Sequence, residues 1–361
     1  MALPLRVRLL SACFFGIALL ASSIGWVPAA RAQTETAPIR LKVVGGLAGV
    51  SQFVRYEEPF WRRRITELTN GRVVAEVAPF DRSGIRGQEM LQLMRLGVVP
   101  FGTALLALVA TEEPEFNAVD LPALSPDIDS LRTTVAAFRP HLEEVLRERY
   151  QIEMLGVYTY PAQVVFCTRP FAGLADLAGR RIRVSSVGQS DLLLALGATP
   201  VVTPFAEMLP ALRGGVVECA ITGTLSGNAV GLHEVTSHVH ALALNWGISI
   251  FGANADAFAA LPRDMQAAIR AGVAELEAAI WAAADGETGD GLACNSGQAT
   301  CVAGRRGQMV VVPVSAADNE RRRRLLTEAV LPRWVNRCGP DCVDAWNAHL
   351  APVLGIRARA D

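Results

Sequence analysis

Short apolar runs alternate along this chain with longer segments that mix apolar and charged positions. In the first half, runs typical of β-strands occupy 39–46, 72–80 and 152–160. The mixed segments 57–72 and 127–151 are typical of helices. This order of elements predicts strands that alternate with helices from the start of the pattern.

The alternation repeats after residue 160. Strand-like runs occupy 162–171, 180–186 and 216–223, and a helix is predicted at 188–197. A further helix at 262–288 is long enough to brace two domains. Strands alternating with helices indicate an α/β fold, with mostly parallel sheets that carry helices on both faces.

The N-terminal segment has the features of a secretory signal peptide rather than of a membrane span. Two arginines precede a long apolar run that closes with the small-x-small sequence Ala30-Arg31-Ala32. We therefore expect a signal peptide at 1–32, cleavage after Ala32 and a periplasmic protein. Residues 10–13 resemble a lipoprotein box, but most of the apolar run follows them, whereas a lipidated mature chain begins polar.

Length and charge indicate the number of domains and exclude some kinds of binding partner. The 329 residues after the signal peptide are too many for one compact core and predict two domains. Residues 1–32 contain three arginines and no acid, so their removal changes the formal net charge from −1 to −4. A basic footprint is absent, so no nucleic-acid partner is expected. No later run is apolar enough to predict a membrane anchor.

Six cysteines follow the signal peptide, and an even number in an oxidising compartment favours disulfides. The closest pairs are Cys294 with Cys301 and Cys338 with Cys342, both in segments where a small loop can close. Cys167 and Cys219 lie in apolar strand-like runs and are either buried thiols or a third pair.

The sequence contains no recognised arrangement of catalytic residues. His233 and His238 are five positions apart, whereas a helical zinc pair needs a separation of four. His238 and His240 can share a strand face, which leaves a weak metal possibility. The segment at 188–192 lacks the last glycine of a nucleophile elbow. We therefore expect no catalytic residues, no metal and no cofactor.

An exported two-domain α/β protein without catalytic groups indicates a binding protein that closes over its ligand by hinge motion. The expected architecture is the two-domain periplasmic binding protein fold, type II-like, with hinge strands near 158–161 and 245–248. The expected domain boundaries are 38–160 plus 247–285 for domain 1, and 161–246 plus 286–355 for domain 2.

One stretch of the sequence is specific enough to indicate a protein family. Residues 166–223 contain "RPFAGLADLAGRRIRV", "LGATPV" and "FAEMLPALRGGVVE", and "ELTNGRVVAEVAPF" and "EMLQLMRLGVVPFG" precede them in order. These blocks resemble the solute-binding subunits of TRAP transporters (tripartite ATP-independent periplasmic transporters), the DctP-type family. The likeness covers roughly residues 40–350.

The resemblance implies a role for Arg183, which lies in the "IRV" segment. In these proteins an arginine at this place binds the ligand carboxylate. A guanidinium offers a planar fork of donors that pairs with a carboxylate through two hydrogen bonds. Burying it without an anion is costly. The alternative is an internal ion pair with an acid such as Glu207 or Glu218.

The same resemblance implies that Phe205 packs against the ligand and that Thr222 stands where many relatives carry a ligand-binding asparagine. Gln163 falls near the place of a second family arginine. Leu105 and Leu106 occupy a stretch that is polar in sugar-acid binders. Fewer polar groups predict a ligand less hydroxylated than a sialic acid, such as an aromatic or short aliphatic monocarboxylate.

Several weaker candidates complete the predicted site. Trp246 and Phe53 supply ring surface either to the ligand or to the core. Gln52, Tyr56 and Glu89 sit on or near turns that face the cleft in this fold. Asn245 lies at a predicted crossover strand, and the alternative for all four is a surface or capping role.

The predicted function is therefore that of a receptor which delivers an organic acid to TRAP membrane permease subunits. The first rival is the binding protein of an ABC importer or of a sensor kinase. A rival of another class is a periplasmic metal-dependent hydrolase that uses His233, His238 and His240. A third rival is a purely structural periplasmic protein.

Overall fold

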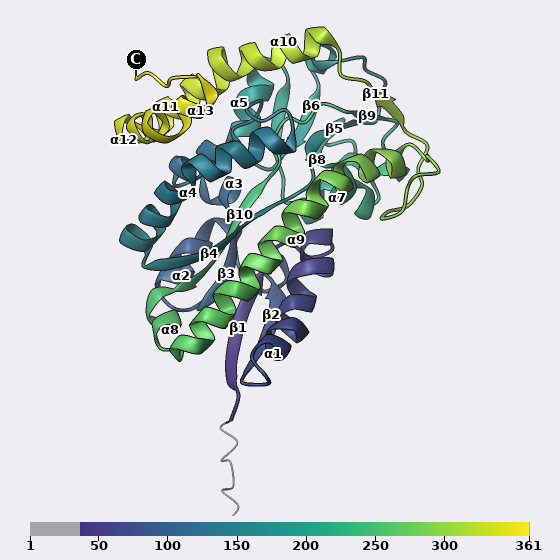
Figure 1. Ribbon diagram of the computed structural model, residues 1–361. Helices are drawn as coiled ribbons and strands as arrows, with labels where there is room; N and C mark the ends of the chain where they lie inside the picture. The colour runs from purple at the N-terminus through teal and green to yellow at the C-terminus, as the bar shows by residue number, and fades with distance from the viewer. Residues whose placement is uncertain (1–36, 361) are drawn as a thin grey trace, which may run out of the picture. The chain divides into compact units, whose positions relative to one another are not determined.

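The computed structural model describes residues 37–360, so the predicted signal peptide and its cleavage site lie outside the described residues. The strands form two sheets (Figure 1). Sheet 1 has the order β2 (Val73–Pro79), β1 (Ile39–Gly45), β3 (Phe101–Leu105), β10 (Ile248–Asn254) and β4 (Ile152–Thr159). Sheet 2 has the order β11 (Val310–Val312), β9 (His238–His240), β5 (Gln163–Cys167), β8 (Cys219–Gly223), β6 (Arg181–Val184) and β7 (Thr199–Val202).

The predicted helices are present, and shorter ones are added between them. The helical stretch before β2 ends with α1 (Ile65–Leu68), after which Asn70 and Gly71 adopt positive φ angles of 50° and 80° and stop it. The other α-helices are α2 (Met90–Arg95), α3 (Leu106–Val109), α4 (Ile128–Tyr150), α5 (Val187–Ala195), α6 (Met208–Arg213), α7 (Thr224–Ala229), α8 (Ala255–Ala259), α9 (Arg263–Asn295), α10 (Ala316–Leu325), α11 (Leu331–Cys338), α12 (Pro340–Ala345) and α13 (Ala351–Leu354). Within the described residues, none of the helices is long and apolar enough to cross a membrane.

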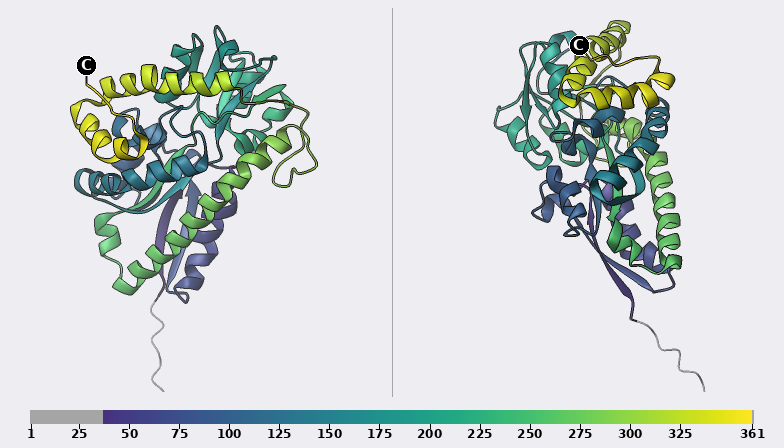
Figure 2. Two further views of the ribbon diagram at one scale, coloured as in Figure 1. Left: turned by 45° about the horizontal axis from the view of Figure 1, so that its top comes forward. Right: turned by 90° about the vertical axis from the view of Figure 1, so that its left-hand side faces the viewer.

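The chain passes between the sheets three times. β4 ends at Thr159 and β5 begins at Gln163, while β9 ends at His240 and β10 begins at Ile248. The two crossing segments are hydrogen-bonded to each other, with Tyr160 N donating to Gly247 O at 3.1 Å. The third passage is α9, which contacts β4 of sheet 1 and α7 beside sheet 2 (Figures 1 and 2).

The crossing strands explain why the sheets are mixed rather than wholly parallel. β10 runs antiparallel to β3 and β4, and β5 runs antiparallel to β8 and β9. Each enters its sheet from the edge at which the parallel strands end, so it must run in the opposite direction. The short crossing segments therefore lie at the carboxyl edge of each sheet. This is the edge at which β1 and β3 end in sheet 1, and at which β6, β7 and β8 end in sheet 2.

Glycine is required at one point of the second crossing. Gly247 has a φ of 93°, a region that residues with side chains rarely adopt. A Cβ atom there would also lie 2.8 Å from Gln163 Nε2. The close approach of the two crossing segments therefore depends on a residue without a side chain.

The apolar core runs through both sheets. Its largest cluster includes Phe138 of α4, Ile182 of β6 and Trp334 of α11. The C-terminal helices contribute to this continuity, because Trp334 donates its indole N–H to Pro114 O at 2.7 Å and Arg333 donates to Asp191 O at 2.6 Å. They contact elements of both halves, and Figure 2 shows them packed over α4.

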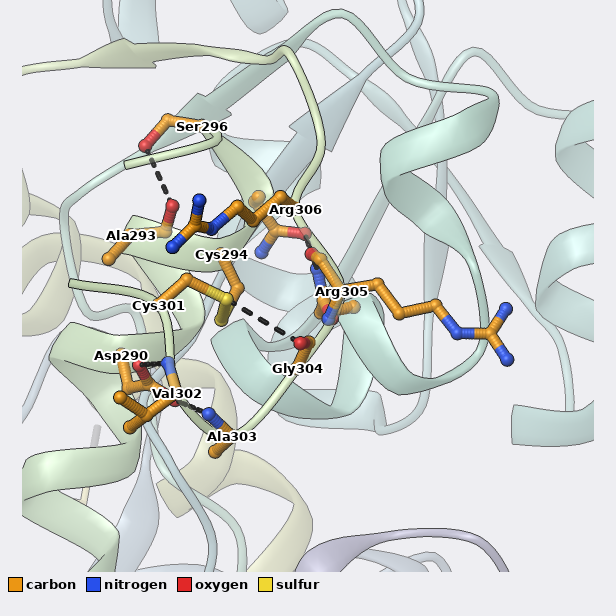
Figure 3. Close-up of a disulfide and its surroundings, with 12 residues drawn as sticks. Asp290, Ala293, Cys294, Ser296, Cys301, Val302, Ala303, Gly304, Arg305 and Arg306 are labelled. Atoms are coloured by element: carbon orange, nitrogen blue, oxygen red, sulfur yellow. Dashed lines mark hydrogen bonds between the residues drawn. A yellow bond between two sulfur atoms is a disulfide. The ribbon is translucent and has the colours of Figure 1, made fainter. Parts of the chain in front are cut away.

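Three disulfides are present. Cys294–Cys301 and Cys338–Cys342 confirm the two predicted local pairs. Cys167 and Cys219, left open by the sequence, lie directly opposite each other on β5 and β8 and are also bonded. Figure 3 shows the loop closed by Cys294–Cys301, where Asp290 accepts hydrogen bonds from the backbone amides of Val302 and Ala303.

Candidate functional site

The candidate residues of sheet 2 gather at one edge. β6, β7 and β8 run parallel and end side by side at Val184, Val202 and Gly223. In open α/β sheets, ligands bind outside the carboxyl ends of the strands. This edge of sheet 2 is therefore the first place to look for a site.

Arg183 lies on β6, one residue before this edge, and its side chain is buried, with 3% of the residue exposed. Its Nε donates to Thr203 O at 2.9 Å, and its Nη1 donates to Ile221 O at 3.0 Å. These two bonds hold the guanidinium between the ends of β7 and β8. A guanidinium has five N–H donors, and its Nη2 makes no hydrogen bond to any described residue.

Arg183 has no acidic partner among residues 37–360. Glu218, one of the two acids suggested by the sequence, pairs with Arg169 instead. Burial lowers the pKa of Arg183 to about 10, so the group stays charged at neutral pH. A buried and unpaired cation is costly, and an anion that accepts from the free donors offsets that cost.

Phe205 and Thr222 flank the arginine. Phe205 follows β7 and packs against two apolar clusters, one around sheet 1 and one around sheet 2. Thr222 is buried on β8 opposite Val164, and its hydroxyl makes no hydrogen bond to another described residue. Phe205 therefore lies where the two halves of the molecule meet.

Gln163 and Asn245 belong to a buried amide network at the same edge. Gln189 of α5 donates from Nε2 to Gln163 Oε1 at 2.7 Å and to Asn245 Oδ1 at 3.0 Å. Its Oε1 accepts from the Ser185 amide at 2.8 Å. No local signal in the sequence marks Gln189, because its partners Gln163 and Asn245 are 26 and 56 positions away.

Asp120 is a second residue that the sequence did not reveal. It is buried and accepts from Trp246 N at 2.9 Å, Gly247 N at 2.7 Å and Asn245 Nδ2 at 3.3 Å. Burial raises its pKa to about 6, although these hydrogen bonds oppose the change. The carboxylate therefore fixes the second crossing segment, 126 positions away in sequence from Trp246.

The candidates of sheet 1 gather at the carboxyl ends of β1 and β3. Leu105 ends β3, and Gln52 and Phe53 begin the helical stretch that follows β1. Gln52 is buried and donates to Glu57 Oε1 at 3.2 Å and to Ser249 Oγ at 3.3 Å. Phe53 is buried in the sheet 1 cluster, and Tyr56 packs on it from outside.

Two candidates lie apart from these groups. Trp246 is buried in the largest core cluster, and its indole N–H donates to Ser125 O at 3.0 Å. These contacts match the core alternative. Glu89 pairs with Arg86 and lines a surface groove with Lys42, Glu76 and apolar residues after α2. None of the other candidates lines that groove.

The histidines of the hydrolase alternative do not form a cluster. His240 is buried, accepts from Leu242 N at Nδ1 and meets Asp318 Oδ2 from Nε2 at 3.3 Å. In the part of the chain that the structure describes, the one group with metal-ligand spacing is Asp290, Cys294 and Cys301. Its two sulfur atoms are bonded to each other.

Two α/β halves joined by crossing segments, with a buried arginine at the carboxyl edge of sheet 2, match a two-domain binding-protein fold. The chain belongs to bacterial extracellular solute-binding protein family 7 (DctP), whose family model matches residues 56–290. This is the family of the TRAP solute-binding proteins, which are receptors rather than enzymes.

Solved structures of this family share the fold. The chain is similar to DctP7 of Bordetella pertussis, an extracytoplasmic solute receptor that binds pyroglutamic acid, with a TM-score of 0.76, 21% identity, and coverage of 86% of this chain and 99% of that one. It is also similar to a TRAP periplasmic solute-binding protein of Desulfovibrio salexigens with bound orotic acid (TM-score 0.75, 18% identity, 86% and 97% covered). A third, from Sulfurospirillum deleyianum, holds succinate (TM-score 0.73, 20% identity, 87% and 99% covered).

Two curated relatives match over part of their length. A solute-binding protein of Roseobacter denitrificans is 24% identical over 49% of this chain and 54% of its own length. The outer membrane transporter protein TsaT of Comamonas testosteroni is 25% identical over 49% of this chain and 52% of its own length. The match therefore spans about half the length of each relative.

Proposed function

We propose that this protein is the extracytoplasmic receptor of a TRAP-type transporter and that it captures an organic acid anion between its two halves. Secretion through the signal peptide at 1–32, with cleavage after Ala32, and delivery to membrane permease subunits belong to the same proposal. Each sheet with its helices acts as one lobe, with boundaries near residues 160 and 247, and the crossing segments act as hinges.

One observation supports this proposal above the others. Arg183 is a buried guanidinium whose donors are only partly used and whose counter-charge is absent from residues 37–360. A ligand carboxylate supplies that charge through a bidentate contact with the guanidinium. Phe205 packs on the ligand, and Thr222 and Gln163 donate or accept at its side. The apolar Leu105 and Phe205 favour a monocarboxylate with few hydroxyl groups.

The test is a thermal-shift and calorimetric screen of organic acids against the wild-type protein. A ligand at 100 times its dissociation constant should raise the unfolding free energy by about 2.7 kcal/mol. Arg183→Ala should abolish the shift, and Arg183→Lys should leave weak binding because the planar fork of donors is lost.

Arg181→Ala is the matched control. Arg181 lies two positions earlier on the same strand, is exposed, and donates to Val216 O and Gly215 O rather than to the strand edge. It should bind the ligand as the wild type does. Unchanged affinity in Arg183→Ala would remove the anchor role, and a screen without any organic-acid ligand would remove the proposed function itself.

A further inference from the structure

A set of polar contacts joins the two halves of the molecule apart from the crossing segments. Ser51 and Arg55 lie at the start of the helical stretch that follows β1. Ser51 Oγ donates to Glu287 Oε2 at 2.5 Å, and Arg55 Nη2 donates to Ala303 O at 2.9 Å. Arg55 Nη1 also lies 3.9 Å from Glu287 Oε1. We call these three contacts the bridging contacts.

The helical stretch that carries the two donors is fixed to sheet 1. Gln52 donates to Ser249 Oγ of β10, and Glu57 accepts from Thr103 Oγ1 of β3. Trp61, further along the stretch, is fully buried in the apolar cluster of sheet 1. The donors of the bridging contacts are therefore carried by the sheet 1 half.

The acceptors belong to the sheet 2 half. The last turns of α9 pack so closely on α7 that a Cβ atom on Gly291 would lie 2.4 Å from Leu225 N. Asn295, the last residue of α9, donates to Thr224 O at 3.0 Å. The chain after α9 leads to β11, which pairs with β9 of sheet 2. Because the donors move with sheet 1 and the acceptors with sheet 2, a change in the angle between the halves makes or breaks the bridging contacts.

The loop that presents Ala303 is held in place although residues 296–309 form no helix or strand. The disulfide Cys294–Cys301 ties the loop to the end of α9 (Figure 3). Asp290 accepts from Val302 N at 2.8 Å and from Ala303 N at 2.6 Å. The carbonyl group of Ala303 is therefore fixed from within the sheet 2 half before any contact with Arg55.

Asn228 of α7 anchors the other side of the same loop. Its Nδ2 donates to Arg305 O at 2.8 Å, and its Oδ1 accepts from Arg305 N at 2.7 Å. Ala303 thus lies between two anchored points, the disulfide at Cys301 and the Asn228 contacts at Arg305.

Glu287 shows that the bridging contacts are incomplete in this structure. Its residue is 9% exposed, and its Oε1 is buried without a hydrogen bond to a described residue. Arg55 Nη1, at 3.9 Å, is about 1 Å beyond hydrogen-bond distance from that oxygen. Buried polar atoms are satisfied in the great majority of cases. A further approach of the two halves by about 1 Å at this point would give Glu287 Oε1 its donor.

We propose that the bridging contacts are a latch which is completed when the two halves close, and that the disulfide Cys294–Cys301 preforms the sheet 2 side of this latch. This inference rests on the proposed function, because it requires halves that close over a ligand. Contacts that are stronger in the closed form slow the release of the ligand and leave its entry almost unchanged. Because the loop is ordered before Arg55 reaches it, little conformational entropy is lost when the latch forms.

The experiment measures association and dissociation rate constants by stopped-flow fluorescence. The probe is the acid that binds most tightly in the organic-acid screen, in which L-pyroglutamate, orotate and succinate are included. Arg55→Ala should raise the dissociation rate constant about three- to tenfold, because it removes a hydrogen bond from a charged donor, and should change the association rate constant by less than about twofold. Arg62→Ala is the matched control: Arg62 lies on the same stretch, pairs with Glu58 at the surface and should leave both rate constants unchanged.

Removal of the disulfide tests the preforming role. Cys294→Ser combined with Cys301→Ser should raise the dissociation rate constant by a similar factor. Arg55→Ala should then add little in that background, because both changes remove the same contact. The matched control is Cys338→Ser combined with Cys342→Ser, which removes the other short-range disulfide, within the C-terminal helices, and should leave the dissociation rate constant unchanged.

Asp290→Asn tests the loop with its disulfide intact, and so also serves if the disulfide-free chain does not fold. The change removes one of the two carboxylate oxygens that hold the amides of Val302 and Ala303. It should raise the dissociation rate constant about two- to fivefold.

A dissociation rate constant that Arg55→Ala leaves unchanged, or that Arg62→Ala raises equally, overturns the latch and leaves the proposed function standing. Independent, multiplying effects of Arg55→Ala and of disulfide removal overturn the preforming role of the disulfide. Arg183→Ala should abolish binding of the probe and so tests the proposed function separately. A screen in which no acid binds removes the proposed function and, with it, the latch.

Discussion

The sheet 2 half contains a buried pair of ionisable residues, His240 and Asp318, and a single buried cation, Arg183, and the two differ in whether the chain supplies a partner of opposite charge. His240 of β9 and Asp318 of α10 face each other, and Asp318 also accepts from Leu174 N at 2.9 Å and from Ser315 Oγ at 2.7 Å. Arg183 of β6 has two backbone carbonyls and no acid within the described chain. The first group is complete without a ligand and the second is not.

This difference separates the structural role of the His240–Asp318 pair from the binding role that is proposed for Arg183. A buried charge whose partners all come from the chain ties elements together, here α10, β9 and the segment around Leu174. A buried charge that lacks its partner lowers stability in the empty protein and recovers it when an anion binds. Substitutions at the two places should therefore affect different quantities.

The largest expected effect on stability is that of Asp318→Ala. The change leaves the Leu174 amide, the Ser315 hydroxyl and His240 without their shared acceptor. The unfolding free energy should fall by about 3 to 5 kcal/mol in chemical denaturation. Ligand affinity of the folded fraction should not change. Glu320→Ala, at an exposed position of the same helix, should cost little.

A pH titration of stability should distinguish Asp318, which contacts His240, from Glu57, a buried acid of the sheet 1 half whose hydrogen-bond donors are all neutral. The pKa of Glu57 is raised to about 7, so the folded state holds a proton that the unfolded state releases, and stability falls as the pH rises from about 4 to 7. The loss is on the order of 2 to 3 kcal/mol. Burial raises the pKa of Asp318, but hydrogen bonds from Leu174 and Ser315 outweigh it and the net pKa is lowered. Its contribution is therefore lost only as the pH falls below the ordinary range of an aspartate.

Glu57→Gln should flatten the decrease between pH 4 and 7 in urea denaturation. Glu58→Gln is the matched control, since Glu58 is adjacent and pairs with Arg62 at the surface. An equal slope in the wild type and in Glu57→Gln would show that Glu57 is not the group responsible.

The smallest expected effect has the opposite sign to that of Asp318→Ala. Arg183→Met removes a buried charge that has no counter-charge in the chain, so the empty protein should be as stable as the wild type or more stable by up to about 1 kcal/mol. Denaturation without ligand measures this. A loss of several kcal/mol would mean that Arg183 is a structural group like Asp318, and the contrast between the two would disappear.

Much of the fold was predictable because its signals are local. The strand at 39–45, the helix at 128–150 and the stop at Asn70-Gly71 follow from neighbouring residues. The two disulfides whose cysteines are close in sequence were predicted as well. A burial that no local signal marks is that of Arg322, which donates to Ala123 O because α10 packs over the segment that follows Asp120.

The sequence by itself determined the order of strands and helices and the family to which the chain belongs, because each depends on residues that are near one another along the chain; the ligand role of Arg183 stays a prediction. Only the tertiary structure decided the pairing of Cys167 with Cys219, the contact of Asp120 with the second crossing segment, and the position of Glu57 beside Gly46 and Thr103. The physical reason is that a buried polar group takes whichever partner the folded chain brings within about 3 Å, and that partner can lie anywhere in the sequence.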